Sequence, residues 1–297
     1  MAAYTTTMSN LLTNLKAILL LYQDTTLAKL KTWNRGVLGP AAIFPAIAIL
    51  PIRESYEYAL SNSKYDVIRD VSLQVFDLKF DIEQAHDNTV DLVKAIKDIF
   101  EDNHTLSGTT YSLTWGSENY GDTIEVGSKS LNRSSIVISA KSRETYPTLT
   151  VQNTITSNVN VTDLQDKIKT IMVNNKSTYY STVNTIKDSP IKPVPKPPAI
   201  LIGAGYKQRN QTTPNADMSL VFVDIAVVTH LFAKETSLNH NLSIVEGVKD
   251  VLQINNQLDG YCEYSNISYI DFEPERTKSG FIYLTTITLA CKMREYL

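Results

Sequence analysis

The sequence predicts an α+β protein made of two tandem copies of a small domain, each with a mixed or antiparallel β-sheet packed against two helices. The stretch ISAKSRETY at 138–146 contains Lys-x-Arg-Glu, and TLACKMREYL at 288–297 repeats this pattern 151 residues later. Strand-like alternation and helix-like spacing of apolar residues also recur in the same order in both halves. We therefore expect one domain at 1–150 and a second copy at 151–297.

Each half is predicted to begin with an amphipathic helix. Leucine and isoleucine recur at helical spacing after Ser9, and again 153 residues later, after Thr162. Both residues are good N-caps, and Thr162 with Gln165 matches the capping-box pattern. Apolar residues at positions i, i+4 and i+7 predict a second helix in each half, at 92–100 and at 244–252.

The remaining regular segments are predicted to be strands. FPAIAI at 44–49 matches PPAILI at 197–202, an apolar strand next to proline in both halves, and strict alternation predicts strands around 71–75 and 223–227. The proline-rich stretch 189–198 is interpreted as an extended approach to a strand, with a Pro-x-x-Pro ligand as the alternative. Four polar stretches are predicted to be loops, at 52–65, 116–133, 204–217 and 271–280.

Composition places the chain among ordinary core-forming proteins. It has 297 residues, 43% of them hydrophobic and 20% charged, and its net charge of −3 gives no general reason to expect nucleic-acid binding. Cys262 and Cys291 cannot build a disulfide framework, so we interpret them as small buried residues in a reduced compartment. No apolar stretch is long enough to span a membrane, and the N-terminus lacks the pattern of a secretion signal.

The sequence contains no recognised catalytic motif, so we predict no catalytic, cofactor-binding or metal-ligating residue, and no cofactor. The four histidines are scattered, and ILIGAGYKQ at 200–208 has Gln208 where a dinucleotide fingerprint needs a third glycine. An enzyme with a site in the cleft between the two halves remains a distant alternative. A sheet that binds RNA or peptides would need exposed aromatic residues alternating with Lys or Arg on a strand, and the predicted strands lack that pattern.

The Lys-x-Arg-Glu pattern is the one charged feature that the two halves share closely. On a strand, Lys141 and Arg143 would point to one face of the sheet, and Ser142 and Glu144 to the other. The pattern is consistent with a solvated strand end or with a charged seam against a neighbouring subunit. In the second interpretation the subunit-contact residues are Lys141, Arg143, Glu144, Lys292, Arg294 and Glu295.

The order of these elements resembles that of the tail-terminator (tail-completion) proteins of long-tailed bacteriophages. The matching stretches are LLTNLKAILL, FPAIAIL, VSLQVF, LVKAIKDIF and SIVISA in the first half, and DLQDKIKTIM, PPAILI, VDIAVV, IVEGVKDVL and TITLAC in the second. The resemblance implies a structural virion protein, not an enzyme. Such a protein forms a ring at the head-proximal end of the tail, caps the tail tube, ends its polymerisation and provides the head-joining surface.

The resemblance also implies the partners and the place of assembly. Family rings usually contain six copies of one domain, so two domains per chain imply a ring of three or six chains, assembled in the host cytoplasm. Expected partners are further copies of this chain, the tail tube protein, head-completion or neck proteins, and the sheath protein if the tail is contractile. Neither a membrane nor sequence-specific nucleic acid is expected. Alternatives within this class are a head–tail adaptor and the cap of a phage-derived contractile injection machine.

Overall fold

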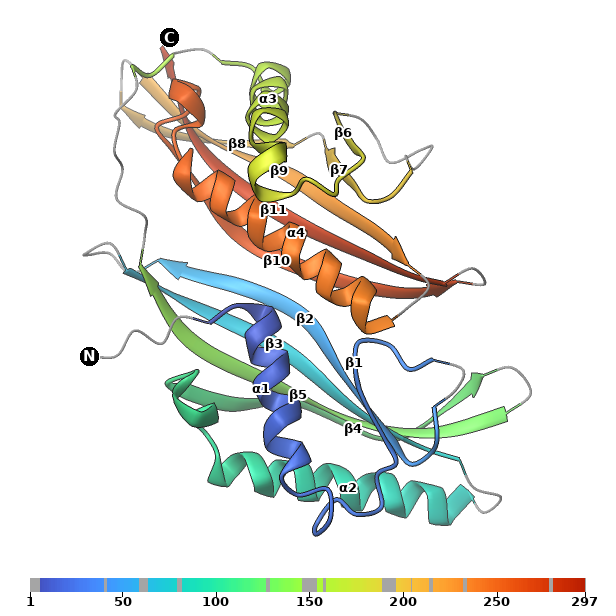
Figure 1. Ribbon diagram of the computed structural model, residues 1–297. Helices are drawn as coiled ribbons and strands as arrows, with labels where there is room; N and C mark the ends of the chain where they lie inside the picture. The colour runs from blue at the N-terminus through green and yellow to red at the C-terminus, as the bar shows by residue number, and fades with distance from the viewer. Residues whose placement is uncertain are drawn as a thin grey trace. The chain divides into compact units, whose positions relative to one another are not determined.

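The computed structural model of the chain has two compact units (Figure 1), formed largely by residues up to Glu144 and by residues from Thr145 onward. The expected boundary at residue 150 lies outside the described residues, so each unit is described by itself. The structure describes the whole chain except residues 1–5, 40–41, 59–63, 79–81, 127–128, 146–153, 157–158, 189–195, 204, 214–215, 232–233, 278–279 and 297.

Unit 1 contains a mixed sheet with two helices. Its elements are α1 (Met8–Leu20), β1 (Thr32–Arg35), β2 (Ala46–Tyr58), β3 (Lys64–Asp77), α2 (Ile82–Asp102), a 3-10 turn (Leu106–Gly108), β4 (Ser112–Val126) and β5 (Lys129–Thr145). The strand order is β4-β5-β3-β2-β1. Strand β1 is parallel to β2, whereas β2 with β3 and β4 with β5 are antiparallel.

Unit 2 also contains a mixed sheet with two helices. Its elements are α3 (Val161–Tyr179), β6 (Thr185–Asp188), β7 (Ala199–Ile202), β8 (Tyr206–Thr213), β9 (Ala216–Leu231), α4 (Lys234–Ile254), a 3-10 turn (Leu258–Gly260), β10 (Tyr264–Thr277) and β11 (Gly280–Tyr296). The strand order is β10-β11-β9-β7-β6, and β8 pairs with the end of β9 that β7 leaves open. The pair β6–β7 is parallel, whereas β10–β11, β11–β9, β7–β9 and β8–β9 are antiparallel. The α+β class with a mixed sheet is therefore confirmed.

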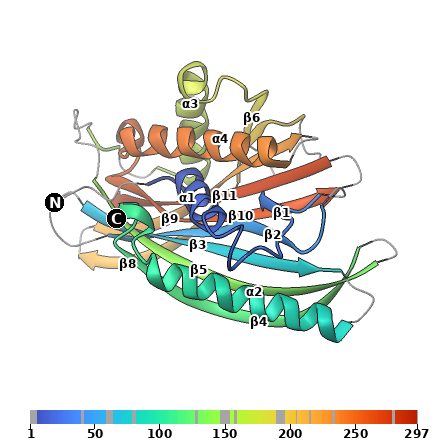
Figure 2. The same ribbon diagram turned by 60° about the horizontal axis from the view of Figure 1, so that its bottom comes forward.

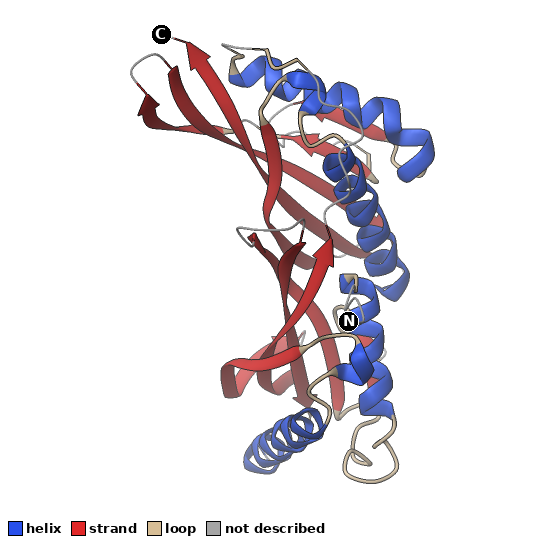
Figure 3. Cartoon of the chain, turned by 90° about the vertical axis from the view of Figure 1, so that its left-hand side faces the viewer, coloured by secondary structure: helices blue, strands red, loops and turns tan. Residues whose placement is uncertain are grey.

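In Figure 1, α1 lies in front of the strands of unit 1 and α4 lies in front of those of unit 2. Helix α2 runs along its own sheet (Figure 2) and contacts β3 and β4. In unit 2 the helices form one layer and the strands another (Figure 3). Alternate residues of β3 and β9, such as Val71, Leu73, Val223 and Ile225, are fully buried and build the cores between these layers.

Both predicted first helices are confirmed, but they begin earlier than expected. The N-cap of α1 is Thr7, whose side chain accepts a hydrogen bond from the backbone N–H of Asn10 at 3.2 Å. The N-cap of α3 is Asn160, which accepts from the N–H of Asp163 at 2.8 Å. Each cap lies two residues before the predicted one, because a second good capping residue precedes the first apolar position.

The four predicted loops are wrong in large part, because strands run through them. Strand β2 continues to Tyr58, and β4 with β5 occupies most of 116–133. Strand β8 lies inside 204–217, and β10 continues to Thr277. These segments are polar on both faces, so the alternation that marks a half-buried strand is missing from them. The predicted approach at 189–198 lies mostly outside the described residues, whereas the strand at 199–202 is confirmed.

Candidate functional site

The Lys-x-Arg-Glu stretch of unit 1 lies near the end of β5, and its side chains alternate between the faces of the sheet as predicted. Ser142 and Glu144 both contact Arg69 of β3. Lys141 and Arg143 both pair with Asp66 of the same strand. Residues 66 and 69 belong to opposite faces of β3.

Arg69 is buried at the centre of the first group. It is the largest fully buried side chain among the described residues. Its Nε donates to Oε1 of Glu54 at 3.1 Å, its Nη1 donates to Oγ of Ser142 at 2.5 Å, and its Nη2 donates to Oε1 of Glu144. These acceptors come from β2 and β5, so a single guanidinium joins three neighbouring strands.

Two tyrosines complete what we call the Arg69 network. The hydroxyl of Tyr56 donates to Oε2 of Glu54, and that of Tyr65 donates to Oε2 of Glu144, both at 2.8 Å. Burial by itself would lower the pKa of Arg69, but the charges of Glu54 and Glu144 outweigh it and raise that pKa above its ordinary value. The network therefore holds a permanent positive charge between two carboxylates, and the second oxygen of each accepts a hydrogen bond from a tyrosine. Its members are Glu54, Tyr56, Tyr65, Arg69, Ser142 and Glu144.

The second group lies on the other face of the sheet and also pairs within unit 1. Nζ of Lys141 is 2.7 Å from Oε2 of Glu57 and 3.4 Å from Oδ2 of Asp66. Nε of Arg143 is 2.8 Å from Oδ1 of Asp66, and its guanidinium lies 5.4 Å from the ring centroid of Tyr111. The positive charges that could form a seam against a neighbour are thus balanced inside the unit, and a subunit contact here stays a prediction.

The ion pair of Asp66 predicts a contribution to acid stability. The hydrogen bond from Arg143 outweighs partial burial and lowers the pKa of Asp66 below 3.8. A lowered folded-state pKa adds stability that is present above the ordinary pKa and lost as pH falls through the lowered one. We expect Asp66→Asn to flatten the fall in the free energy of unfolding below about pH 4, measured by urea unfolding at a series of pH values. Asp91→Asn, at an exposed position of α2, is the matched control. Equal slopes for both variants would contradict the expectation.

The equivalent stretch of unit 2 has different surroundings. Nζ of Lys292 is 3.5 Å from Oε2 of Glu263 and 5.6 Å from the ring centroid of Tyr264. Met293 is buried where unit 1 has Ser142, and Val221 is buried at the position that corresponds to Arg69. The side chains of Arg294 and Glu295 lie outside the described residues. The interior of unit 2 at this end of the sheet is therefore largely apolar, whereas that of unit 1 is ionic.

Exposed aromatic side chains gather on the face of unit 2 that bears Lys292. Tyr206 is 65% exposed and its ring stacks on that of Phe222, with centroids 4.7 Å apart. Tyr264 and Tyr269 are 43% and 37% exposed on β10. Strand registers connect these residues across the sheet and place them on one face. We call Tyr206, Phe222, Tyr264, Tyr269 and Lys292 the aromatic surface of unit 2.

Sequence reasoning missed this surface, because it combines residues from strands far apart in the chain. Exposed aromatic residues occur on β8, which lies inside a predicted loop, and on β10. The signal that could have found it is the pairing register, since Tyr206 stands opposite Phe222 and Tyr264 stands opposite Lys292. Tyrosine suits protein contacts, because its ring buries a large area and its hydroxyl still finds a partner.

Among the described residues, no three His, Cys, Asp or Glu side chains gather in a way that could hold a metal ion. No helix in the described ranges is both long and apolar enough to cross a membrane. Comparison of the sequence with known protein families finds no matching family, and comparison with curated proteins finds no significant relative.

Proposed function

We propose that the chain is a structural protein of a phage tail or neck, built from two tandem copies of one domain. Three or six chains form a ring that caps the tail tube, ends its polymerisation and provides the head-joining surface. The observation that carries the proposal is the similar order of elements in the two units: helix, short strand, further strands, helix, 3-10 turn and a closing strand pair. The two short strands β7 and β8 of unit 2 stand in the place of the single strand β2 of unit 1.

Matching backbone details support the duplication. The 3-10 turn of each unit contains a non-glycine residue in the left-handed region, Ser107 with φ 57° and Asp259 with φ 52°, followed by Gly108 and Gly260 at φ 84° and 90°. Non-glycine residues rarely adopt such angles, so the same placement 152 residues apart favours common ancestry over chance.

The paired strands that follow also match in register. In unit 1 the N–H of Tyr111 donates to the carbonyl of Lys141 at 3.0 Å, and in unit 2 the N–H of Glu263 donates to that of Lys292 at 2.8 Å. The two lysines are those of the shared Lys-x-Arg-Glu pattern, 151 residues apart. This agreement between the sequence and the backbone supports the proposed duplication.

Two like domains in one chain suit a closed ring. A head-to-tail contact between chains closes into a ring when its rotation is a whole fraction of a turn, and three chains then place six domains around the axis. The proposed partners are copies of this chain, the tube protein, neck or head-completion proteins, and the sheath protein of a contractile tail. The aromatic surface of unit 2 supports a role in protein contacts.

Electron microscopy of particles made without this gene tests the proposal. We expect overlong or irregular tails that are separate from filled heads, because nothing ends tube growth or forms the joint. Supplying the gene from a plasmid should restore tails of uniform length, which is the control. Tails of normal length that fail to join heads would assign the adaptor role instead. Intact, infectious particles would contradict the structural proposal, as would a purified chain that stays monomeric by light scattering.

A further inference from the structure

The two cysteines of the chain meet inside unit 2. Cys262 and Cys291 are both fully buried free thiols. Cys291 lies in β11, and Cys262 lies in the turn that leads into β10. The residues that follow them, Glu263 and Lys292, are joined by a backbone hydrogen bond from the N–H of Glu263 to the carbonyl of Lys292 at 2.8 Å. The side chains of Cys262 and Cys291 are within hydrogen-bonding reach of each other.

Two residues that pair with or contact the cysteines each have a buried side-chain oxygen without a hydrogen-bond partner. One is Oγ of Ser265, whose relation to the thiols is that the residue pairs with Cys291 across β10 and β11. Side chains of such a cross-strand pair lie on the same face with their Cβ atoms about 5 Å apart. The other is Oδ1 of Asn256, whose backbone carbonyl accepts a hydrogen bond from Sγ of Cys262 at 3.7 Å. Buried polar atoms without a hydrogen-bond partner are uncommon, and a bound ion is one explanation for them.

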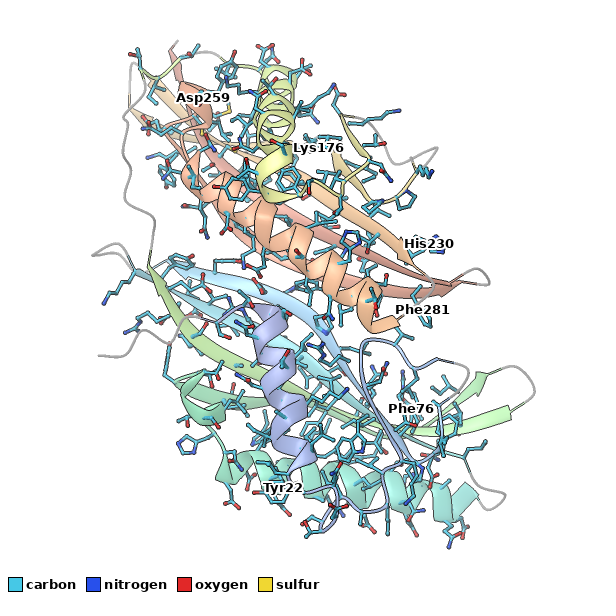
Figure 4. All side chains as sticks on the ribbon, viewed as in Figure 1. Tyr22, Phe76, Lys176, His230, Asp259 and Phe281 are labelled. Carbon is cyan, nitrogen blue, oxygen red and sulfur yellow. The ribbon has the colours of Figure 1, made fainter. Side chains whose placement is uncertain are left out.

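The turn that carries Cys262 is held in place from outside. The carboxylate of Asp259 (labelled in Figure 4) lies 2.8 Å from Nζ of Lys167 in α3, and the same ammonium lies 5.3 Å from the ring centroid of Tyr261. The backbone N–H of Cys262 donates to the carbonyl of Gln257 at 3.3 Å. These contacts fix the turn, and the turn fixes the position of Cys262.

We propose that Cys262 and Cys291 form a binding site for one soft metal ion of the Cu(I) type. Thiolates are the ligands that select soft ions, and two of them suit a monovalent ion. Neutral oxygens of Ser265 and Asn256 supply weak additional donors. Binding breaks two S–H bonds, forms two metal–sulfur bonds and releases two protons, while the oxidation state of the metal stays the same.

Unit 1 provides the matched substitutions for a test. Thr110 occupies the position that corresponds to Cys262, and Ala140 occupies the one that corresponds to Cys291, and both are buried. The variants Cys262→Thr and Cys291→Ala therefore give unit 2 the residues that unit 1 has at these buried positions, so we expect both variants to fold. Circular dichroism checks that each variant is folded, and either variant alone decides the outcome if the other unfolds.

The experiment is titration of the full chain with Ag(I), a soft ion that resembles Cu(I) and needs no reductant. For the wild type we expect uptake of one ion per chain in native mass spectrometry, with a dissociation constant below about 1 μM. Two protons should be released per ion in weakly buffered solution, and the thermal midpoint should rise. Each cysteine variant should lose this uptake.

Three results would overturn the proposal. The wild type could take up no silver, or both variants could bind it as tightly as the wild type does. The third is that the thiols of the isolated chain fail to react in denaturant, because a disulfide has consumed them.

Discussion

Replacing Arg69 with methionine is expected to lower the free energy of unfolding by about 3–5 kcal/mol. The substitution removes the cation of the Arg69 network and leaves the carboxylates of Glu54 and Glu144 without it. Glu54 is fully buried, so water cannot take the place of the guanidinium. Because a whole domain is stable by only about 5–15 kcal/mol, unit 1 should be close to unfolding at room temperature. Urea unfolding followed by circular dichroism measures the change.

The matched control is Arg143→Met, which removes another arginine–carboxylate pair in the same unit. The side chain of Arg143 is 52% exposed, and exposed pairs contribute less than about 1 kcal/mol. A triple variant with Arg69→Met, Glu54→Gln and Glu144→Gln should be more stable than Arg69→Met alone, because no unpaired buried charge remains. If Arg69→Met costs no more than Arg143→Met, the network has little weight in the stability of the unit.

The Arg69 network also explains why the sequence predicts only part of the strands. Strands are predicted around 71–75 and 223–227 because alternate residues there are apolar, and the structure contains both strands. Beyond them, β2 and β3 bury Glu54 and Arg69 instead of apolar residues. A polar residue that faces inward is indistinguishable in sequence from one that faces water, because only its partner on another strand satisfies it. The loop predicted at 52–65 follows from that ambiguity.

The candidate sites, too, could be predicted from the sequence only in part. The alternation of Lys141 to Glu144 could be predicted, because it follows from the period of a single strand. The partners of these side chains could not, since Asp66 and Arg69 lie more than 70 residues away in sequence. The aromatic surface of unit 2 needs the register of β8, β9, β10 and β11 together. Local patterns thus determine which way a side chain points, whereas its neighbours depend on strand pairing over long distances.

Gly205→Ala is expected to cost about 3 kcal/mol of stability. A Cβ atom built on Gly205 would lie 1.8 Å from the carbonyl oxygen of Phe222 and 2.8 Å from its carbonyl carbon. Both atoms belong to the backbone of β9, so no side-chain rotation relieves the overlap. The backbone next to Gly205 must therefore shift. The shift disturbs the start of β8, where Tyr206 pairs with Phe222 and stacks on its ring. Urea unfolding measures the loss, and hydrogen exchange of the β8 amides should show faster exchange there.

Gly203→Ala, two residues earlier, is the matched control. Its Cβ would lie 3.3 Å from the carbonyl oxygen of Asp224, a close contact that a shift of a few tenths of an ångström relieves. We expect a loss of about 1 kcal/mol or less. The comparison also assigns a role to the glycines of ILIGAGYKQ, which resemble part of a phosphate-binding fingerprint. In a strand, glycine can allow another backbone to approach closely. A large loss at Gly205 alone would show that this contact requires the glycine, whereas equal tolerance at both positions would contradict that explanation.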